Sequence, residues 1–197
     1  MGERINTLLA AAKESLLISS PYFIPGVAGA RTLAGLAAAG RRIRVLTNSL
    51  AATDVIAVHG AYARYRRALL AAGVEIFELK PEPKRHRASL FGSRTASLHT
   101  KAFLVDAAVG FVGSFNLDPR SASINTEMGL LFSCPRIMQQ LKSVIEAQMR
   151  QEFSYALVLR HGRIVWTERK EGRDLTHSSE PEAPLRRYLP ARLISWL

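Results

Sequence analysis

Apolar residues in the first eighty positions alternate between helical spacing and short unbroken runs. Unbroken runs bounded by turn residues are typical of buried strands, and the spaced stretches predict helices with one apolar face. The expected order is a helix near residues 5–12, a strand at 16–18, a helix at 27–39, a strand at 43–47, a helix from about 53 and a strand at 74–79. Gly40 and Gly73 stand where the two longer helices end, which is a favoured place for glycine. This alternation predicts parallel βαβ units.

The pattern changes after residue 79. Residues 80–97 carry two prolines and little apolar periodicity, which predicts an exposed basic loop. Its cations are Lys80, Lys84, Arg85, Arg87 and Arg94. Short apolar runs at 102–105 and 109–112 predict a hairpin, and a third run follows at 128–132. The fold class expected from the whole pattern is α/β, with a mixed sheet flanked by helices.

The last quarter of the chain predicts one more helix and a second hairpin. The helix covers about 135–150, with Ile137, Leu141, Val144 and Ile145 facing inward. The hairpin pairs 154–160 with 164–169. We therefore expect a domain over residues 1–170 and a C-terminal tail over 171–197. The tail is polar until its last apolar stretch, 191–197, which has no evident partner in the sequence.

The composition says little about the fold, but the net charge indicates which kinds of partner the chain binds. The 197 residues are 48% hydrophobic and 22% charged, which is ordinary for one globular domain. A net charge of +11 favours phosphate-rich partners such as nucleic acid or anionic lipid. Cys134 is the one cysteine, which excludes an internal disulfide and a multi-cysteine metal site. No apolar run reaches the roughly 20 residues of a membrane span, and no secretory signal is visible.

Polar residues that suit phosphate chemistry gather between residues 98 and 127. His99 and Lys101 are two apart in an extended segment, so they project to the same face. An imidazole can attack phosphorus or move a proton, and an ammonium can neutralise phosphoryl oxygens. Ser114 and Asn116 are again two apart after an apolar run, and they add neutral hydrogen-bond donors. The set does not suit a metal, because a lysine stands where a second ligand would be needed.

These residues resemble the HKD signature of the phospholipase D superfamily. The pattern reads His99-x-Lys101-x4-Asp106-x6-Gly113-Ser114-x-Asn116, with every fixed position filled. The resemblance implies that Glu127 orients the catalytic histidine and that Lys101, Ser114 and Asn116 hold phosphoryl oxygens. Asp106 stands at a strand-to-turn junction, where a carboxylate readily accepts backbone N–H groups, so we expect it to support the site rather than react.

The flanking segments resemble bacterial cardiolipin synthases, especially the proteobacterial third type. They are Ser20-Pro21-Tyr22-Phe23-Ile24-Pro25-Gly26, residues 46–54, and Ser114-Phe115-Asn116-Leu117-Asp118-Pro119-Arg120-Ser121. Tyr22 and Arg120 are the substrate-binding candidates in these flanks. Asp54 is interpreted as a cap of the helix that follows it. His59 lies on an apolar helical stripe, which favours a packed core or interface position.

The resemblance implies phosphodiester exchange without a metal or an organic cofactor. One histidine attacks phosphorus to form a phosphatidyl-histidine, and a second protonates the leaving alcohol and then activates the acceptor. Phosphatidylglycerol and an alcohol acceptor would be the substrates, and cardiolipin the product. The expected location is peripheral, on the cytoplasmic side of the bacterial inner membrane. Which role His99 takes is left open by the sequence.

One departure from the resemblance is decisive for function. Cardiolipin synthases carry two HKD motifs in one chain, and this sequence holds one. It looks like a C-terminal half, truncated after Leu197, that needs a second HKD half from an identical chain or a separate N-terminal chain. Two alternatives remain: a homodimeric single-HKD nuclease or phosphodiesterase, which would bind nucleic acid, and an inactive fragment of a split gene.

Overall fold

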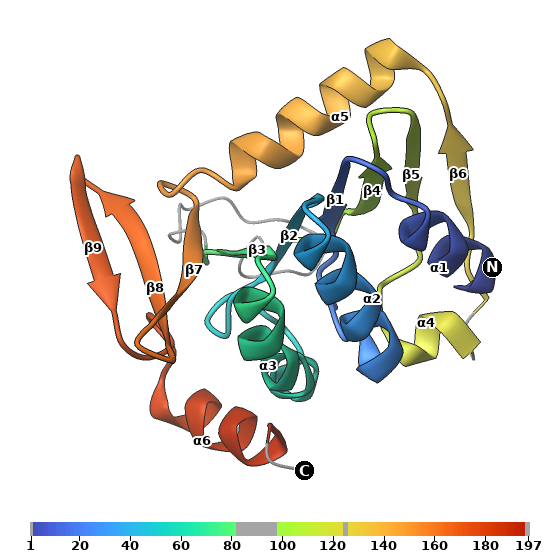
Figure 1. Ribbon diagram of the computed structural model, residues 1–197. Coiled ribbons are helices and arrows are strands. Elements are labelled where there is room, and N and C mark those ends of the chain that lie inside the picture. Colours follow the sequence, from blue (N-terminus) through green and yellow to red (C-terminus); the bar gives the residue numbers. More distant parts are fainter. Residues whose placement is uncertain (1, 82–97, 124–125, 196–197) are drawn as a thin grey trace, which may run out of the picture.

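A computed structural model describes residues 2–81, 98–123 and 126–195 of the chain. These residues form nine strands in a single sheet, together with six helices (Figure 1). The helices are α1 (Gly2–Ala10), α2 (Gly26–Ala38), α3 (Ile56–Ala71), α4 (Pro119–Ser123), α5 (Pro135–Gln148) and α6 (Leu185–Ile194). The strands are β1 (Ser15–Ser19), β2 (Arg42–Asn48), β3 (Glu75–Leu79), β4 (Lys101–Val105), β5 (Val109–Gly113), β6 (Gly129–Phe132), β7 (Ser154–Arg160), β8 (Arg163–Lys170) and β9 (Arg173–His177).

The sheet is mixed, as the sequence predicts, and its order is β6-β5-β4-β1-β2-β3-β7-β8-β9. Strands β1, β2 and β3 are parallel, with α2 and α3 as their connections. All other neighbouring strands in the sheet of described residues pair antiparallel, including the two predicted hairpins, β4–β5 and β7–β8. Gly40 and Gly73 have φ angles of +84° and +95° directly after α2 and α3, so both predicted helix ends are confirmed.

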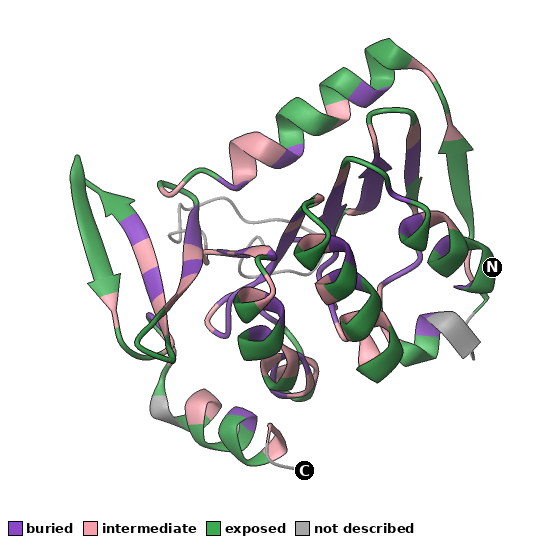
Figure 2. Ribbon diagram, viewed as in Figure 1, coloured by how far each residue is buried: buried purple, intermediate pink, exposed green. Residues whose placement is uncertain are grey.

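Helices cover both faces of the sheet and enclose two cores (Figure 1). The larger core lies beneath α1, α2 and α3 and includes Ile18, Ile43, Val45 and Leu69. The smaller core lies between the sheet and α5, and Leu46, Leu104 and Ile145 belong to it. Figure 2 shows the central strands as the most buried part, with β6 and β9 exposed at the two edges of the sheet.

The inward face of α5 differs from the predicted one. Met138 and Ile145 are buried, whereas Ile137 and Val144 are about half exposed. The prediction followed the most branched aliphatic residues, but methionine fills irregular space well and packs here instead. The helix is therefore rotated from the expected orientation. Ile145 is buried as predicted, and Leu141 is partly buried against the same core.

The predicted basic loop begins differently from the expectation. Lys80 is not an exposed cation: its ammonium lies 2.7 Å from the Glu168 carboxylate, and only 13% of its side chain is exposed. The ammonium also donates to the carbonyl of Gln151 at 2.7 Å. Lys84, Arg85, Arg87 and Arg94 lie outside the described residues.

The C-terminal segment, as far as residue 195, is folded onto the rest of the chain, although the sequence predicted a tail whose last apolar stretch has no evident partner. Strand β9 extends the sheet beyond residue 170, and α6 packs on α3. Gly60 in α3 allows this approach, because a Cβ there would lie 2.8 Å from the carbonyl oxygen of Ala191. Sequence periodicity missed both elements, since β9 is exposed almost throughout and α6 carries an internal proline, Pro190.

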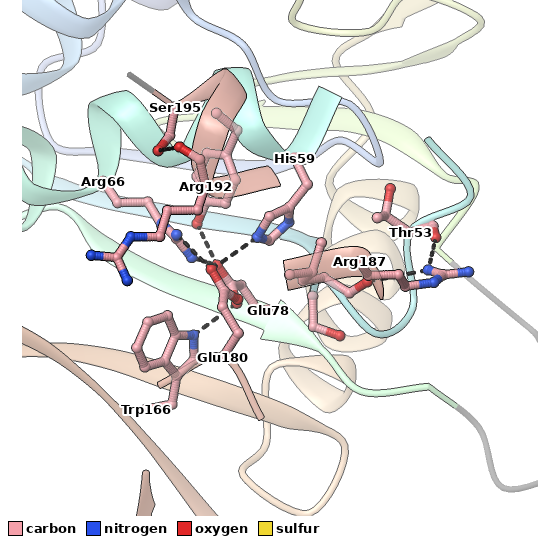
Figure 3. A network of polar contacts seen from close by, with 12 residues as sticks. Thr53, His59, Arg66, Glu78, Trp166, Glu180, Arg187, Arg192 and Ser195 are labelled. Atoms are coloured by element: carbon pink, nitrogen blue, oxygen red, sulfur yellow. Dashed lines mark hydrogen bonds and ion pairs between the residues drawn. The ribbon is translucent and has the colours of Figure 1, made fainter. Parts of the chain in front are cut away.

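A buried polar network joins this segment to the core (Figure 3). Arg66 of α3 donates to Glu78 at 3.0 Å and to Glu180 at 2.6 Å, and all three side chains are at least 92% buried. Glu180 also lies 3.2 Å from His59 Nε2. Burial alone would raise the pKa of Glu180, but the charges and hydrogen bonds of Arg66 and His59 together outweigh burial and lower it. His59, Glu78 and Glu180 have a spacing that could hold a metal ion, yet the guanidinium already supplies the cation there.

Candidate active site

Five strand ends meet at one end of the sheet. Strands β1 and β2 run parallel, β4 runs opposite to β1, and β5 and β6 then alternate. The last residues of β1, β2 and β5 therefore lie at the same end as the first residues of β4 and β6. This end collects the segments that carry the HKD residues, because Lys101 pairs with Gly113 and Gly113 pairs with Gly129.

Hydrogen bonds of the backbone at Leu98 and at His99 fix the segment that carries His99 and Lys101. Leu98 exchanges two hydrogen bonds with the Asn48 amide, one from its N–H at 2.9 Å and one to its carbonyl at 3.3 Å. Leu98 and Asn48 are both buried, so this pair fixes the start of the segment. The Lys101 ammonium donates to the His99 carbonyl at 2.7 Å. The His99 side chain is exposed at this end of the sheet.

Ser114 and Glu127 are brought together by the β5–β6 pair. The Ser114 hydroxyl donates to Glu127 Oε2. The Ser114 N–H donates to the Met128 carbonyl at 2.8 Å, and the Met128 N–H donates to the Ser114 hydroxyl at 2.9 Å. Gly113 makes this approach possible, because a Cβ there would lie 2.7 Å from Phe111 Cζ and would also meet the Met128 carbonyl. A side chain at position 113 would therefore displace Ser114 from Glu127.

Asn116 occupies a tightly bonded turn after Ser114. Its N–H donates to the Ser121 hydroxyl at 3.3 Å, and Ser121 in turn donates to the Asp118 carboxylate. Asp118 also accepts the N–H of Ser121 at the start of α4. Asn116 Oδ1 is buried and has no hydrogen-bond partner among the described residues. This buried acceptor is therefore free to take a hydrogen bond from a ligand, and the other half of the amide, Nδ2, is a donor group by its chemistry.

Tyr22 and Asp54 form a second polar pair at the same end of the sheet. The Tyr22 hydroxyl donates to Asp54 Oδ2 at 2.8 Å. Burial, followed by the hydrogen bond and charge of Asp54, raises the pKa of Tyr22 to about 12. The interpretation of Asp54 as a helix cap is wrong: the capping position of α3 is Val55, and it makes no side-chain cap bond.

Charge at this end of the sheet centres on Lys101. Partial burial lowers the pKa of the Lys101 ammonium, and the negative charges of Glu127 and Asp54 oppose that shift. Two carboxylates from different loops thus act on this cation through their charge. Arg120, the other predicted substrate ligand, is exposed in α4, and its N–H donates to Asp118.

Asp106 is not part of this cluster. It follows β4 at the opposite end from Lys101, and its carboxylate accepts the N–H groups of Lys13, Glu14 and Ser15, each at 2.8 Å. Burial would raise the pKa of Asp106, but these three donors outweigh it and lower the pKa. Asp106 therefore ties the start of β1 to the turn after β4, and β4 separates it from Lys101.

Replacing Asp106 by asparagine should lower the free energy of unfolding by about 1–2 kcal/mol at pH 7, because three charge-assisted hydrogen bonds weaken at a partly exposed site. A lowered folded pKa stabilises the fold above the ordinary aspartate value of 3.8, and this contribution is lost as the pH falls through the folded value. Urea unfolding at several pH values measures this. Asp174→Asn is the control, since Asp174 is 71% exposed. An equal loss in both variants would contradict this role.

The structure adds two site residues that sequence reasoning did not single out, and it gives Asp54 a different role. Asn48 anchors the histidine segment, and Asp54 bonds to Tyr22. Ser20 links the two flanking segments, because its hydroxyl accepts the N–H of Leu117 at 3.2 Å and donates to the carbonyl of Tyr22. All three lie within the flanking segments quoted above: Ser20 directly follows β1, Asn48 is the last residue of β2, and Asp54 is in the loop after β2. Their position at strand ends was the available signal, but their partners are far away in the sequence.

Two solved structures share the fold of this chain. Nuc of Salmonella typhimurium, a phospholipase D family member, superimposes with a TM-score of 0.57 and 14% identity, over 74% of this chain and 84% of that one. Phosphatidylserine synthase of Haemophilus influenzae superimposes with a TM-score of 0.57 and 19% identity, over 78% and 36%. At these identities the likeness is one of fold.

Sequence relatives are more specific. Cardiolipin synthase C of Escherichia coli is 38% identical over 99% of this chain and 42% of the relative. Cardiolipin synthase A of Pseudomonas syringae is 34% identical over 74% and 26%. The chain thus spans less than half the length of these curated relatives. The family model described as "Cardiolipin synthase, PLD-like domain" matches residues 5–149, a range that holds every HKD position described above. The chain therefore belongs to this family of phospholipase D-like domains.

Proposed function

We propose that this chain is one half of a phosphatidyltransferase that makes cardiolipin from phosphatidylglycerol. The observation that carries the proposal is that two bonded pairs, Lys101 with the His99 carbonyl and Ser114 with Glu127, lie at the same end of the sheet in a chain of the cardiolipin synthase family. His99 is exposed there, so its imidazole is accessible to a phosphodiester. The neighbouring ammonium, hydroxyl and amide suit the negative oxygens of that group.

The proposed reaction has two displacements at phosphorus. An imidazole nitrogen attacks, the phosphorus–nitrogen bond forms, and the bond to the leaving alcohol breaks as a second imidazole gives that alcohol a proton. The second imidazole then takes the proton of the acceptor alcohol, whose oxygen displaces the first imidazole. His99 fills one of these two roles. Lys101, Ser114 and Asn116 hold the phosphoryl oxygens through both steps.

The second imidazole comes from another HKD half in this proposal. The described part of the chain supports a pairing surface around the site. Val27, Val55 and Met128 are 68%, 38% and 79% exposed. They follow the loops that carry Tyr22, Asp54 and Glu127, so they surround the same end of the sheet. Apolar side chains around a polar centre are typical of a surface that another protein covers.

Contact with an anionic membrane completes the proposal. The net charge of +11 favours binding to phosphatidylglycerol surfaces, where each nearby cation contributes about 1 kcal/mol. None of the helices in the described ranges is long and apolar enough to cross a bilayer. The substrate would therefore be reached from the membrane surface.

The same charge favours a second candidate, a nuclease that acts on the phosphodiesters of nucleic acid. Product analysis separates the two. The chain is incubated with phosphatidylglycerol vesicles or with single-stranded DNA, alone and together with the N-terminal half of a cardiolipin synthase relative. Cardiolipin with released glycerol supports the proposal. Cleaved DNA without cardiolipin supports the nuclease, and the absence of both products from a paired, folded sample contradicts both candidates.

A further inference from the structure

The C-terminal segment reaches the loop between β2 and α3 through a single arginine. Arg187 of α6 donates from Nη1 to the carbonyls of Leu50, Ala51 and Thr53, at 3.2, 3.4 and 2.6 Å (Figure 3). Segment 178–195 is itself held by the buried pairs that Glu180 forms with Arg66 and His59. Arg187 therefore extends from an anchored segment and not from a free end.

The loop of residues 50–53 needs a hydrogen-bond donor like Arg187 for its buried carbonyls. Leu50, Ala52 and Thr53 are at most 3% exposed, although the loop has no strand or helix to satisfy its backbone. Its N–H groups at Ala52 and Thr53 bond to the Ser49 carbonyl. The carbonyls of Leu50 and Thr53 point instead to Arg187, and a buried carbonyl without a partner is unfavourable.

This loop carries a residue of the candidate active site. Asp54 directly follows Thr53, and its carboxylate accepts the Tyr22 hydroxyl at 2.8 Å. The Asp54 charge also acts on Lys101. A displacement of Thr53 would move Asp54 relative to both partners, because the two residues share one peptide bond.

We propose that Arg187 is a positioning residue of the phosphodiester site, acting through the 50–53 carbonyls to hold Asp54 against Tyr22. The inference rests on the proposed function for its catalytic consequence, but its structural part stands by itself. The family model ends at residue 149, so this contribution comes from outside the matched domain. Segment 178–195 is accordingly part of the active-site architecture of this half.

The structural part is tested without any activity. Arg187→Gln removes the charge and the forked donor group, and Arg186→Gln is the matched control, because Arg186 is the exposed neighbour on the same helix. Hydrogen exchange of the Ala52 and Thr53 amides should rise at least about tenfold in Arg187→Gln and stay unchanged in Arg186→Gln. The NMR signal of Tyr22 Cζ should shift in the first variant alone. Unchanged exchange and an unchanged Tyr22 signal in a folded Arg187→Gln protein would overturn the proposal.

The catalytic part is tested by a double-mutant cycle in the paired protein. Arg187→Gln should reduce kcat/KM for phosphatidylglycerol about tenfold, and Tyr22→Phe should reduce it by a similar factor. If both act through the Tyr22–Asp54 pair, the double variant should lose little more than either single one. Fully multiplicative losses would contradict the positioning role. If the wild-type chain turns over no phosphodiester, the proposed function fails, while the exchange and NMR results still decide the role of Arg187.

Discussion

Replacing His99 by asparagine should reduce phosphodiester turnover at least about a thousandfold in the paired protein. Asparagine cannot attack phosphorus in place of imidazole, and it cannot exchange a proton near neutral pH. The loss should be of this size in either role that His99 takes, since both displacements need two imidazoles. Steady-state turnover of phosphatidylglycerol measures it.

The chain offers a matched control for this variant. His161 is also exposed, and it lies in the turn between β7 and β8 with a φ of 48°, a conformation that asparagine tolerates. His161→Asn should keep wild-type turnover. Because His99 is exposed, His99→Asn should also keep the wild-type thermal unfolding midpoint. A folded His99→Asn protein with more than a tenth of the wild-type turnover would refute the assignment.

Pairing with the second half should fail when charges are placed around the site. The double variant Val27→Asp/Met128→Asp should weaken association at least about a hundredfold, because an unpaired carboxylate buried at an interface costs several kcal/mol. The fold should tolerate both changes. Val27 lies in the first turn of α2, where a negative charge is favourable, and the Met128 side chain is 79% exposed. The fraction of paired protein, measured by sedimentation, and the turnover of phosphatidylglycerol should decline together.

Leu189→Asp/Leu193→Asp is the control for that experiment. Both leucines are exposed, at 63% and 68%, and they lie on α6, which packs on α3. This variant should associate and react like the wild type. Equal association of the two double variants would show that the partner half binds elsewhere.

Local sequence rules predicted most of the central fold. The helix ends at Gly40 and Gly73 and both hairpins depend on interactions between residues near in sequence, and all are confirmed. The strand parity of His99 and Lys101 and the spacing to Ser114 also follow from short segments. The contact of Ser114 with Glu127 needed the pairing of β5 with β6, which no spacing along the chain predicted.

The charged residues that the sequence placed wrongly all bind partners far away in the sequence. The sequence predicted Lys80 to be a solvated cation, but Lys80 forms an ion pair with Glu168 of β8, two strands away from β3 in the sheet. Glu180 and Arg187 looked like parts of a polar tail, yet the first pairs with Arg66 and the second caps the 50–53 carbonyls. Charged residues mark a surface in sequence patterns, so a buried ion pair is recognised only after both partners have been placed.

The central claim is that His99 works in a site completed by a second HKD half. The most direct test measures molar mass by light scattering and turnover of phosphatidylglycerol in the same chromatographic fractions of the purified chain. The account predicts that turnover appears only in fractions with at least twice the monomer mass of 21.7 kDa, or after the N-terminal half of a relative is added. A strictly monomeric fraction that makes cardiolipin at the rate of the paired fractions would contradict it.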